Sequence, residues 1–183
     1  MVTDEELKKF LEAARVTSSL REFIPELVKP GKTFLQVADA VEKEIYSAGA
    51  APAFPVNVSL NDIAAHYTPK ISDASVFTEK DVVKIDFGVH VDGFIIDNAI
   101  TIDLSGEHAT LVEAAEQALE NALAIIKPGV SNKEVGAIVQ ETIVKKGFKP
   151  IENLCGHSIE QYSLHAGVEV PNVPKGNYVF QEG

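Results

Sequence analysis

The chain has little cysteine, little positive charge and no long hydrophobic run. Cys155 is the single cysteine among 183 residues, so no disulfide can form within the chain. The 16 Lys and Arg residues against 27 Asp and Glu residues give a net charge of −11, which argues against nucleic acid or an anionic membrane as the primary partner. No apolar stretch approaches the roughly 18 residues of a membrane span, and no signal-peptide pattern opens the sequence. We therefore predict a cytoplasmic protein.

The remaining composition is that of a globular protein. Hydrophobic residues make up 45% and charged residues 23% of the chain, a balance typical of a folded domain. A chain of this length can bury roughly 70% of its unfolded surface without disulfides or metal to hold it. Helices and strands are both predicted below, so the fold class is mixed α/β.

Helical patterns occupy the first part of the sequence. Thr3 and Glu6 form a capping-box pattern, and apolar residues then recur at helical spacing until Lys29–Gly31, where proline and glycine end the helix. Thr33 begins a second helix that ends at Gly49. The next thirty or so residues have no clear period and are predicted as loop with short strands.

A second pair of helices follows later in the chain. The spacing predicts helices over 110–127 and 132–146, and Ser131 and Glu134 form another capping box. The remainder, 148–183, is predicted as loop and strand.

The chain resembles itself at an offset of 98 positions. Chance is the alternative, but several matches without a gap in the same helix–turn–helix pattern favour a duplication. We predict two αβ halves about a pseudo-two-fold axis, 1–109 and a partial second half 110–183, with a site in the cleft between them. The second half looks incomplete, because its hairpin would begin at Glu182. The matching pairs are Lys29–Gly31 with Lys127–Gly129, Val37 with Val135, Val41 with Val139, Ile45 with Ile143, Gly49 with Gly147, and Pro52 with Pro150.

The clearest strand signal is a hairpin over 82–91 and 94–103. Asp92-Gly93 is the two-residue turn that most favours type I′, so each cross-strand pair should sum to 185. Side chains alternate between faces, which places Asp86 and Asp97 on one face as diagonal neighbours, with an apolar core face behind them. Two carboxylates aimed at one point repel unless a cation or shared proton lies between them. The alternative is two solvated aspartates on an exposed face.

The histidines offer further candidate ligands. His157 follows a glycine in a short strand-to-loop stretch, His165 lies eight residues later, and His66 lies in a loop. A single histidine is more often structural, so none of these positions decides alone. His90, beside the turn, is expected in solvent. Cys155 near His157 could bind a soft metal, but a carboxylate-rich site favours harder ions, which leaves a buried spectator thiol.

The motifs lie in seven stretches that run in order along the sequence: Ala51–Pro55, Asn57, Ser59–Asn61, Ala64–Pro69, Lys84–Asp97, Asn153–His157 and Leu164–Gly167. Together these stretches resemble methionine aminopeptidase of the type 2 branch, in its archaeal form. The resemblance covers nearly the whole chain in order and implies the pita-bread fold of two αβ halves in one catalytic domain. It also implies removal of the initiator methionine from nascent proteins by hydrolysis with a metal-bridged hydroxide.

The resemblance also assigns roles to residues. It implies that two divalent ions (Co, Mn, Fe or Zn) are bound by Asp86, Asp97 and His157, with Asp97 bridging both. It further implies that His66 and His165 contact the substrate, an N-terminal methionine peptide, and stabilise the tetrahedral intermediate. The methionine pocket would be lined by Phe54 and Leu164.

Two glutamate ligands of the family, one of them also the general base, belong to segments that would follow Gly183. We therefore expect the 183-residue chain alone to release no methionine and to bind metal weakly. The full-length form is expected to be a monomer. The fragment is expected to self-associate through an unpaired strand edge and an exposed apolar face of the first hairpin.

Two alternatives stay open. A prolidase-like peptidase would share the fold and the metal centre, although the segment 64–69 favours the methionine enzyme. A pita-bread protein without catalysis would act as a binding module, but such proteins lose ligands, and the three that this stretch can hold are present.

Overall fold

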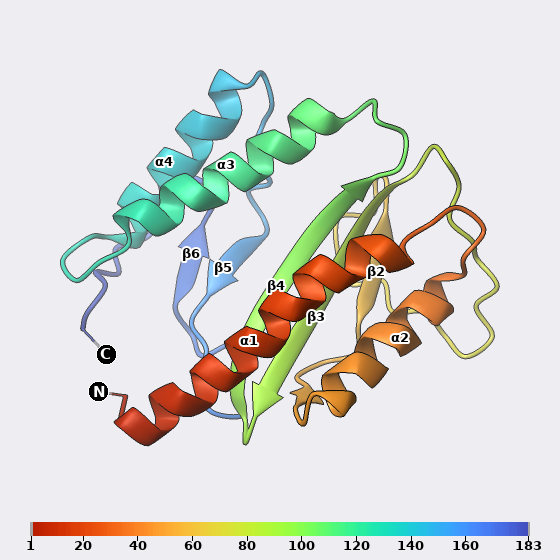
Figure 1. Ribbon diagram of the computed structural model, residues 1–183. Helices are drawn as coiled ribbons and strands as arrows, with labels where there is room; N and C mark the ends of the chain where they lie inside the picture. The colour runs from red at the N-terminus through yellow and green to blue at the C-terminus, as the bar shows by residue number, and fades with distance from the viewer. Residues whose placement is uncertain (1, 183) are drawn as a thin grey trace. The chain divides into compact units, whose positions relative to one another are not determined.

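The computed structural model describes residues 2–182, and the chain divides into two compact units. One unit comprises Thr3–His108, and the other begins at Ala109. Among the described residues, no helix is both long and apolar enough to cross a membrane. Helices and strands are labelled in Figure 1.

Two capped helices open the first unit. Helix α1 (Asp4–Leu27) and helix α2 (Phe34–Ser47) each begin with a complete capping box, on Thr3 and Thr33 respectively. The threonine hydroxyl accepts a hydrogen bond from the backbone amide three residues later. The side-chain oxygen of that later residue accepts one from the threonine amide, so two backbone donors at the helix start are satisfied. Both predicted helix starts are confirmed.

An antiparallel sheet forms the rest of the first unit. Strand β3 lies in the middle, with β4 on one side and the two short strands β1 and β2 on the other. The pairing of β2 with β3 sets Asn57 opposite Asp86. The strand bounds are β1 Ala51–Pro52, β2 Asn57–Leu60, β3 Val82–Val91 and β4 Phe94–Asp103.

The predicted hairpin register is confirmed along its whole length. Val91 pairs with Phe94 across the turn, and Val82 pairs with Asp103 at the far end. Asp92 and Gly93 both have positive φ, 49° and 84°, as a type I′ turn requires. The turn fixes the register, and the register fixes which side chains share a face.

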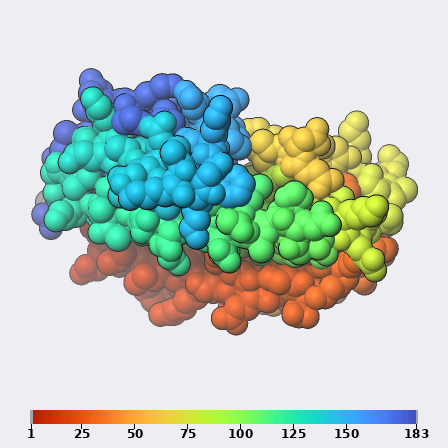
Figure 2. All heavy atoms as spheres, turned by 90° about the horizontal axis from the view of Figure 1, so that it is seen from above, coloured from red at the N-terminus to blue at the C-terminus, as the bar shows by residue number. Residues whose placement is uncertain are grey.

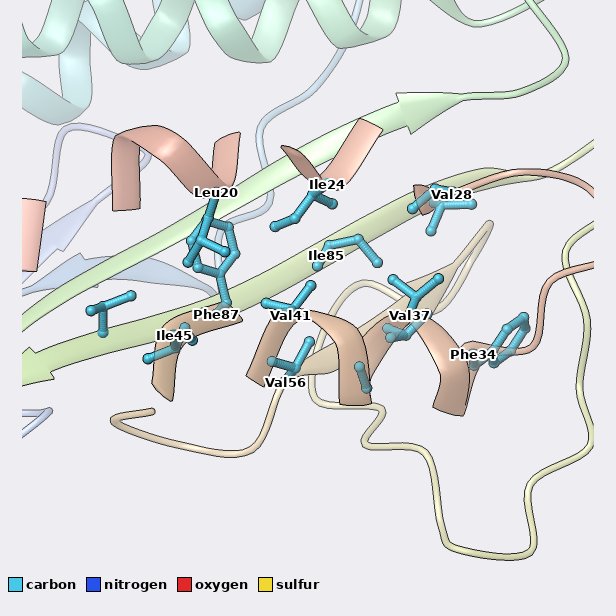
Figure 3. Close-up of a cluster of buried hydrophobic side chains, with 14 of the residues drawn as sticks. Leu20, Ile24, Val28, Phe34, Val37, Val41, Ile45, Val56, Ile85 and Phe87 are labelled. Carbon is cyan, nitrogen blue, oxygen red and sulfur yellow. The ribbon is translucent and has the colours of Figure 1, made fainter. Parts of the chain in front are cut away.

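The apolar face of the hairpin lies in the core. Ile85, Phe87 and Val89 on β3 are completely buried, and Figure 3 shows Ile85 and Phe87 among the apolar side chains of the two helices. The expectation that this face is exposed is therefore wrong, and self-association of the fragment stays a prediction. The helix residues of this core that Figure 3 labels are Leu20, Ile24, Val28, Phe34, Val37, Val41 and Ile45.

The second unit pairs two helices with a small sheet. Helix α3 (Ala109–Ile125) packs against helix α4 (Asn132–Lys145), which begins with the predicted capping box on Ser131. Strands β5 (Cys155–His157) and β6 (Glu169–Pro171) pair antiparallel. Strand β6 and the residues after it lie against Gly136 on α4, where an added Cβ would be 2.1 Å from the Val173 carbonyl oxygen. Only glycine allows this close approach.

The internal repeat is visible in the hydrogen bonds that start the second helix of each unit. Gly31 N donates to Phe77 O in the first unit, and Gly129 N donates to Phe180 O in the second. The glycines are 98 positions apart, as predicted, but the acceptors are 103 apart. The connecting segment of the second unit is therefore five residues longer, which an ungapped sequence comparison could not show.

The second unit carries an apolar groove of about 550 Å³ along α3 and α4. Figure 2 shows these helices side by side at the surface. The groove is lined by the exposed Leu119 and Leu123 on α3 and by the buried Val135 and Val139 on α4. The positions 37 and 41, which match these valines in the first unit, are buried in the core beside β3. The exposed apolar surface of the described chain thus includes the second helix pair and not the hairpin face.

Candidate metal centre

Asp86 and Asp97 share one face of the hairpin, as the sequence predicts. Asp86 pairs with Ala99, and Asp97 pairs with Gly88, so the two carboxylates are diagonal neighbours. Both residues are half-buried. Carboxylate oxygens are the donors that hard divalent cations prefer, and the pair fits part of such a site.

Asn57 lies beside Asp86 on this face. Its Nδ2 is 3.4 Å from Asp86 Oδ2, and its Oδ1 accepts a hydrogen bond of 2.6 Å from Thr68 Oγ1. The sequence analysis missed both contacts. The register of β2 against β3 brings Asn57 to Asp86, and no short turn joins these strands to fix that register.

Phe54 lies directly over Gly88. A Cβ at Gly88 would come within 2.4 Å of Phe54 Cε1 and 2.8 Å of Ala53 Cβ, so the aromatic ring occupies the space that a side chain would need. Because Gly88 is the partner of Asp97 and shares the face of Asp86, this ring borders the carboxylates. Its predicted role in the substrate pocket stays a prediction, and this position suits it.

His66 lies in an exposed loop and has a left-handed backbone, with φ of 66°. Such φ values are uncommon for residues other than glycine. The loop is fixed to β2, because Tyr67 O accepts from Val58 N at 2.7 Å and Tyr67 N donates to Ser59 Oγ at 3.4 Å.

Lys84 and His90 lie at the two ends of the same face of β3. Burial lowers the pKa of Lys84, and the charge of Asp62 partly opposes this shift. The Nζ of Lys84 donates to Asn61 O at 2.8 Å. His90 is half-buried and its Nδ1 accepts from Gly93 N at 3.1 Å. The expectation that His90 lies free in solvent is wrong, because its ring caps the hairpin turn.

The other candidate histidines lie together in the second unit. His157 ends β5 opposite Glu169, and the centre of its ring is 4.2 Å from that of His165. His157 is half-buried and His165 is exposed. Leu164, beside His165, is half-buried.

Cys155 is exposed, so the expectation of a buried thiol is wrong. Desolvation raises the pKa of the thiol, and the nearby Glu169 carboxylate raises it further.

The candidate ligands are divided between the units, with Asp86 and Asp97 in the first and His157 in the second. Within residues 2–182, no three His, Cys, Asp or Glu side chains gather into a group that could hold a metal. The convergence of the three residues on one ion therefore stays a prediction, as do the substrate roles of His66, His165, Phe54 and Leu164.

A family comparison decides the class. The model of metallopeptidase family M24 matches residues 8–183. The chain belongs to this family. The family resemblance expected from the motifs is confirmed, and M24 proteins are metallopeptidases, which agrees with a pair of carboxylates on one sheet face.

Methionine aminopeptidases resemble this chain in both sequence and fold. The methionine aminopeptidase of Pyrococcus horikoshii is 47% identical over 180 residues, which are 97% of this chain and 61% of that protein. The M24 chain thus spans about three-fifths of the length of this curated relative. The methionine aminopeptidase of Thermotoga maritima superposes with a TM-score of 0.88 at 28% identity, covering 99% of this chain and 77% of that one.

A prolidase also shares the fold. The prolidase of Pyrococcus furiosus has a TM-score of 0.84 at 23% identity, covering 99% of this chain and 54% of that one. At this identity the likeness shows the fold alone. The predicted α/β pita-bread fold is confirmed by these structures.

Proposed function

We propose that this M24 chain belongs to a methionyl aminopeptidase that removes the N-terminal methionine from nascent proteins by metal-dependent hydrolysis. The observation that carries the proposal is the pair Asp86 and Asp97 on one sheet face, bordered by the Phe54 ring over Gly88. The high identity to methionine aminopeptidases supports this substrate over those of prolidases. Because nascent chains are made there, we also propose the cytoplasm as its location.

The ligand set proposed for this chain is Asp86, Asp97 and His157, which would hold two divalent ions. The donors are two carboxylates and one imidazole, which suit Co, Mn, Fe or Zn. When bound, such ions would acidify a water molecule and polarise the scissile carbonyl.

The remaining residues are proposed to hold the substrate. His66 and His165 would donate hydrogen bonds to the peptide as neutral imidazoles, since a charged ring beside the ions would be repelled. Phe54 and Leu164 would line the pocket for the methionine side chain. The fixed loop of His66 supports a positioning role, because its backbone is held to β2 at Tyr67.

The test is methionine release from a Met-Gly-Ser peptide by the natural gene product loaded with Mn²⁺. Asp97→Asn should abolish both release and Mn²⁺ binding, and chelation should abolish release. Asp92→Asn is the matched control, because this carboxylate lies in the hairpin turn and forms an ion pair with Lys9 at 3.1 Å; it should change neither quantity.

Methionine release that persists in Asp97→Asn would refute the proposal. Cleavage of Met-Pro but not of Met-Gly-Ser would indicate a prolidase instead. Mn²⁺ binding without cleavage of either peptide would indicate a binding module.

A further inference from the structure

A hydrogen-bonded series of three side chains, Thr68, Asn57 and Asp86, connects the His66 loop to the candidate ligand Asp86. Thr68, two residues after His66, bonds to Asn57 at 2.6 Å, and Asn57 lies 3.4 Å from Asp86. Asn57 is only 9% exposed, so its amide is fixed within the protein. Its strand pairs directly with β3 at Asp86.

The carboxylate and the hydroxyl together fix the direction of the Asn57 amide. If the amide were reversed, its oxygen would face an Asp86 oxygen, and two acceptors would repel. With the NH₂ group toward Asp86, the amide oxygen is free to accept from the Thr68 hydroxyl, which can donate. The direction is therefore Thr68 O–H to Asn57 C=O, and Asn57 N–H to the Asp86 carboxylate.

The Thr68 end of this series is itself anchored. The backbone of Tyr67, next to Thr68, is bonded to Val58 and Ser59 on β2. These contacts hold the backbone next to Thr68, so the Thr68 hydroxyl reaches Asn57 from an anchored segment. The Asn57–Asp86 contact of 3.4 Å is long for a hydrogen bond, so its contribution to the stability of the fold is expected to be small.

We propose that Asn57, oriented by Thr68, is a positioning residue that sets the Asp86 carboxylate for metal binding. This inference rests on the proposed function, because it takes Asp86 as a ligand. Groups that hydrogen-bond to metal ligands typically alter metal affinity by about 10- to 100-fold when they are removed. Thr68 acts only through Asn57, so its effect should depend on Asn57 being present.

The experiment measures the Mn²⁺ dissociation constant of the natural gene product by titration calorimetry, and the visible spectrum of its Co²⁺ form. Asn57→Leu should raise the dissociation constant about 10- to 100-fold and change the Co²⁺ spectrum. Thr68→Val should act in the same direction, and Thr68→Ser should restore wild-type affinity because it keeps the hydroxyl. Adding Thr68→Val to Asn57→Leu should have no further effect.

Thr142→Val is the matched control. Thr142 takes part in another partly buried Asn–Thr hydrogen bond, 2.9 Å from Asn121, that involves no candidate ligand. Its loss should leave Mn²⁺ affinity unchanged. Thr68 is exposed, so Thr68→Val keeps the test decisive if Asn57→Leu does not fold.

Two results would overturn the inference: unchanged Mn²⁺ affinity in a folded Asn57→Leu protein, or a Thr68→Val effect that adds fully to the effect of Asn57→Leu. Either result leaves the proposed function intact, provided that Mn²⁺ binding by the wild type still requires Asp86. Mn²⁺ binding that survives Asp86→Ala would overturn the assignment of Asp86 as a ligand, and the inference with it.

Discussion

Replacing Gly88 with alanine should displace the Phe54 ring from the carboxylate face. The new Cβ would lie 2.4 Å from Phe54 Cε1, whereas carbon atoms in contact prefer about 3.5–4.0 Å. The ring must therefore move by about 1 Å or more. Ala53 cannot follow easily, because its amide donates to Gly88 O at 2.9 Å and holds the two segments together.

The expected size of the effect follows from two opposed contributions. Alanine in place of a strand glycine would by itself stabilise by roughly 0.5–1 kcal/mol. Overpacking a filled site costs about 1–3 kcal/mol. The Gly88 substitution should therefore lower the free energy of unfolding by about 1 kcal/mol, and by no more than roughly 2.5 kcal/mol.

Urea unfolding of four proteins measures this directly: wild type, Gly88→Ala, Phe54→Ala and the double variant. In the Phe54→Ala background the alanine at 88 should cost less, since only the Ala53 contact remains, and the coupling should be about 0.5–3 kcal/mol. In the active protein, Gly88→Ala should also raise KM for Met-Gly-Ser more than it lowers kcat. Equal costs of the alanine in both backgrounds, and thus no coupling to Phe54, would refute the reasoning.

Two further predictions concern other parts of the chain. Burial raises the pKa of Asp81, but hydrogen bonds from its neighbours lower it more, so it lies below the ordinary 3.8; this stabilisation is complete above the unfolded pKa and is lost as pH falls through the folded one. Asp81→Asn should therefore lower the free energy of unfolding by about 1–3 kcal/mol at pH 7. The difference from wild type should shrink in strong acid, and a difference that does not depend on pH in urea titrations would contradict this. The groove residues Leu119 and Leu123 are 53% and 61% exposed, so the 183-residue chain should self-associate in light scattering. Replacing both with glutamine should reduce that association more than Leu11→Gln, a control that is 51% exposed on α1, and equal effects would disprove a role for the groove.

Local chemistry made much of the secondary structure predictable. The capping boxes on Thr3 and Ser131 need only four consecutive residues. Asp92-Gly93 joins two strands through the shortest hairpin loop, so the register and the shared face of Asp86 and Asp97 follow without any tertiary contact. Motifs then identified the family, which the comparisons confirmed.

The contacts around the carboxylates depended on chain segments that no short turn connects. Asn57 reaches Asp86 across a long connection, and its register is set by how β2 packs on β3. The connection between β2 and β3 is too long to determine their register, so the sequence alone could not predict this pairing. The error at Cys155 has the same origin, because exposure depends on neighbours distant in sequence. The error at His90 does not, since the amide that its ring accepts from belongs to Gly93, three residues along the same hairpin.

The sequence by itself determined the elements, the hairpin register and the family, because these depend on neighbouring residues or on motifs read in order. Only the tertiary structure decided that Phe54 lies over Gly88, that Thr68 orients Asn57, and that His157 and His165 lie side by side. It also showed that the apolar face of the hairpin is covered while the matching helices of the second unit carry an open groove. The physical reason is that burial and side-chain contact are set by the packing of whole elements, and a residue's own sequence neighbourhood does not contain that information.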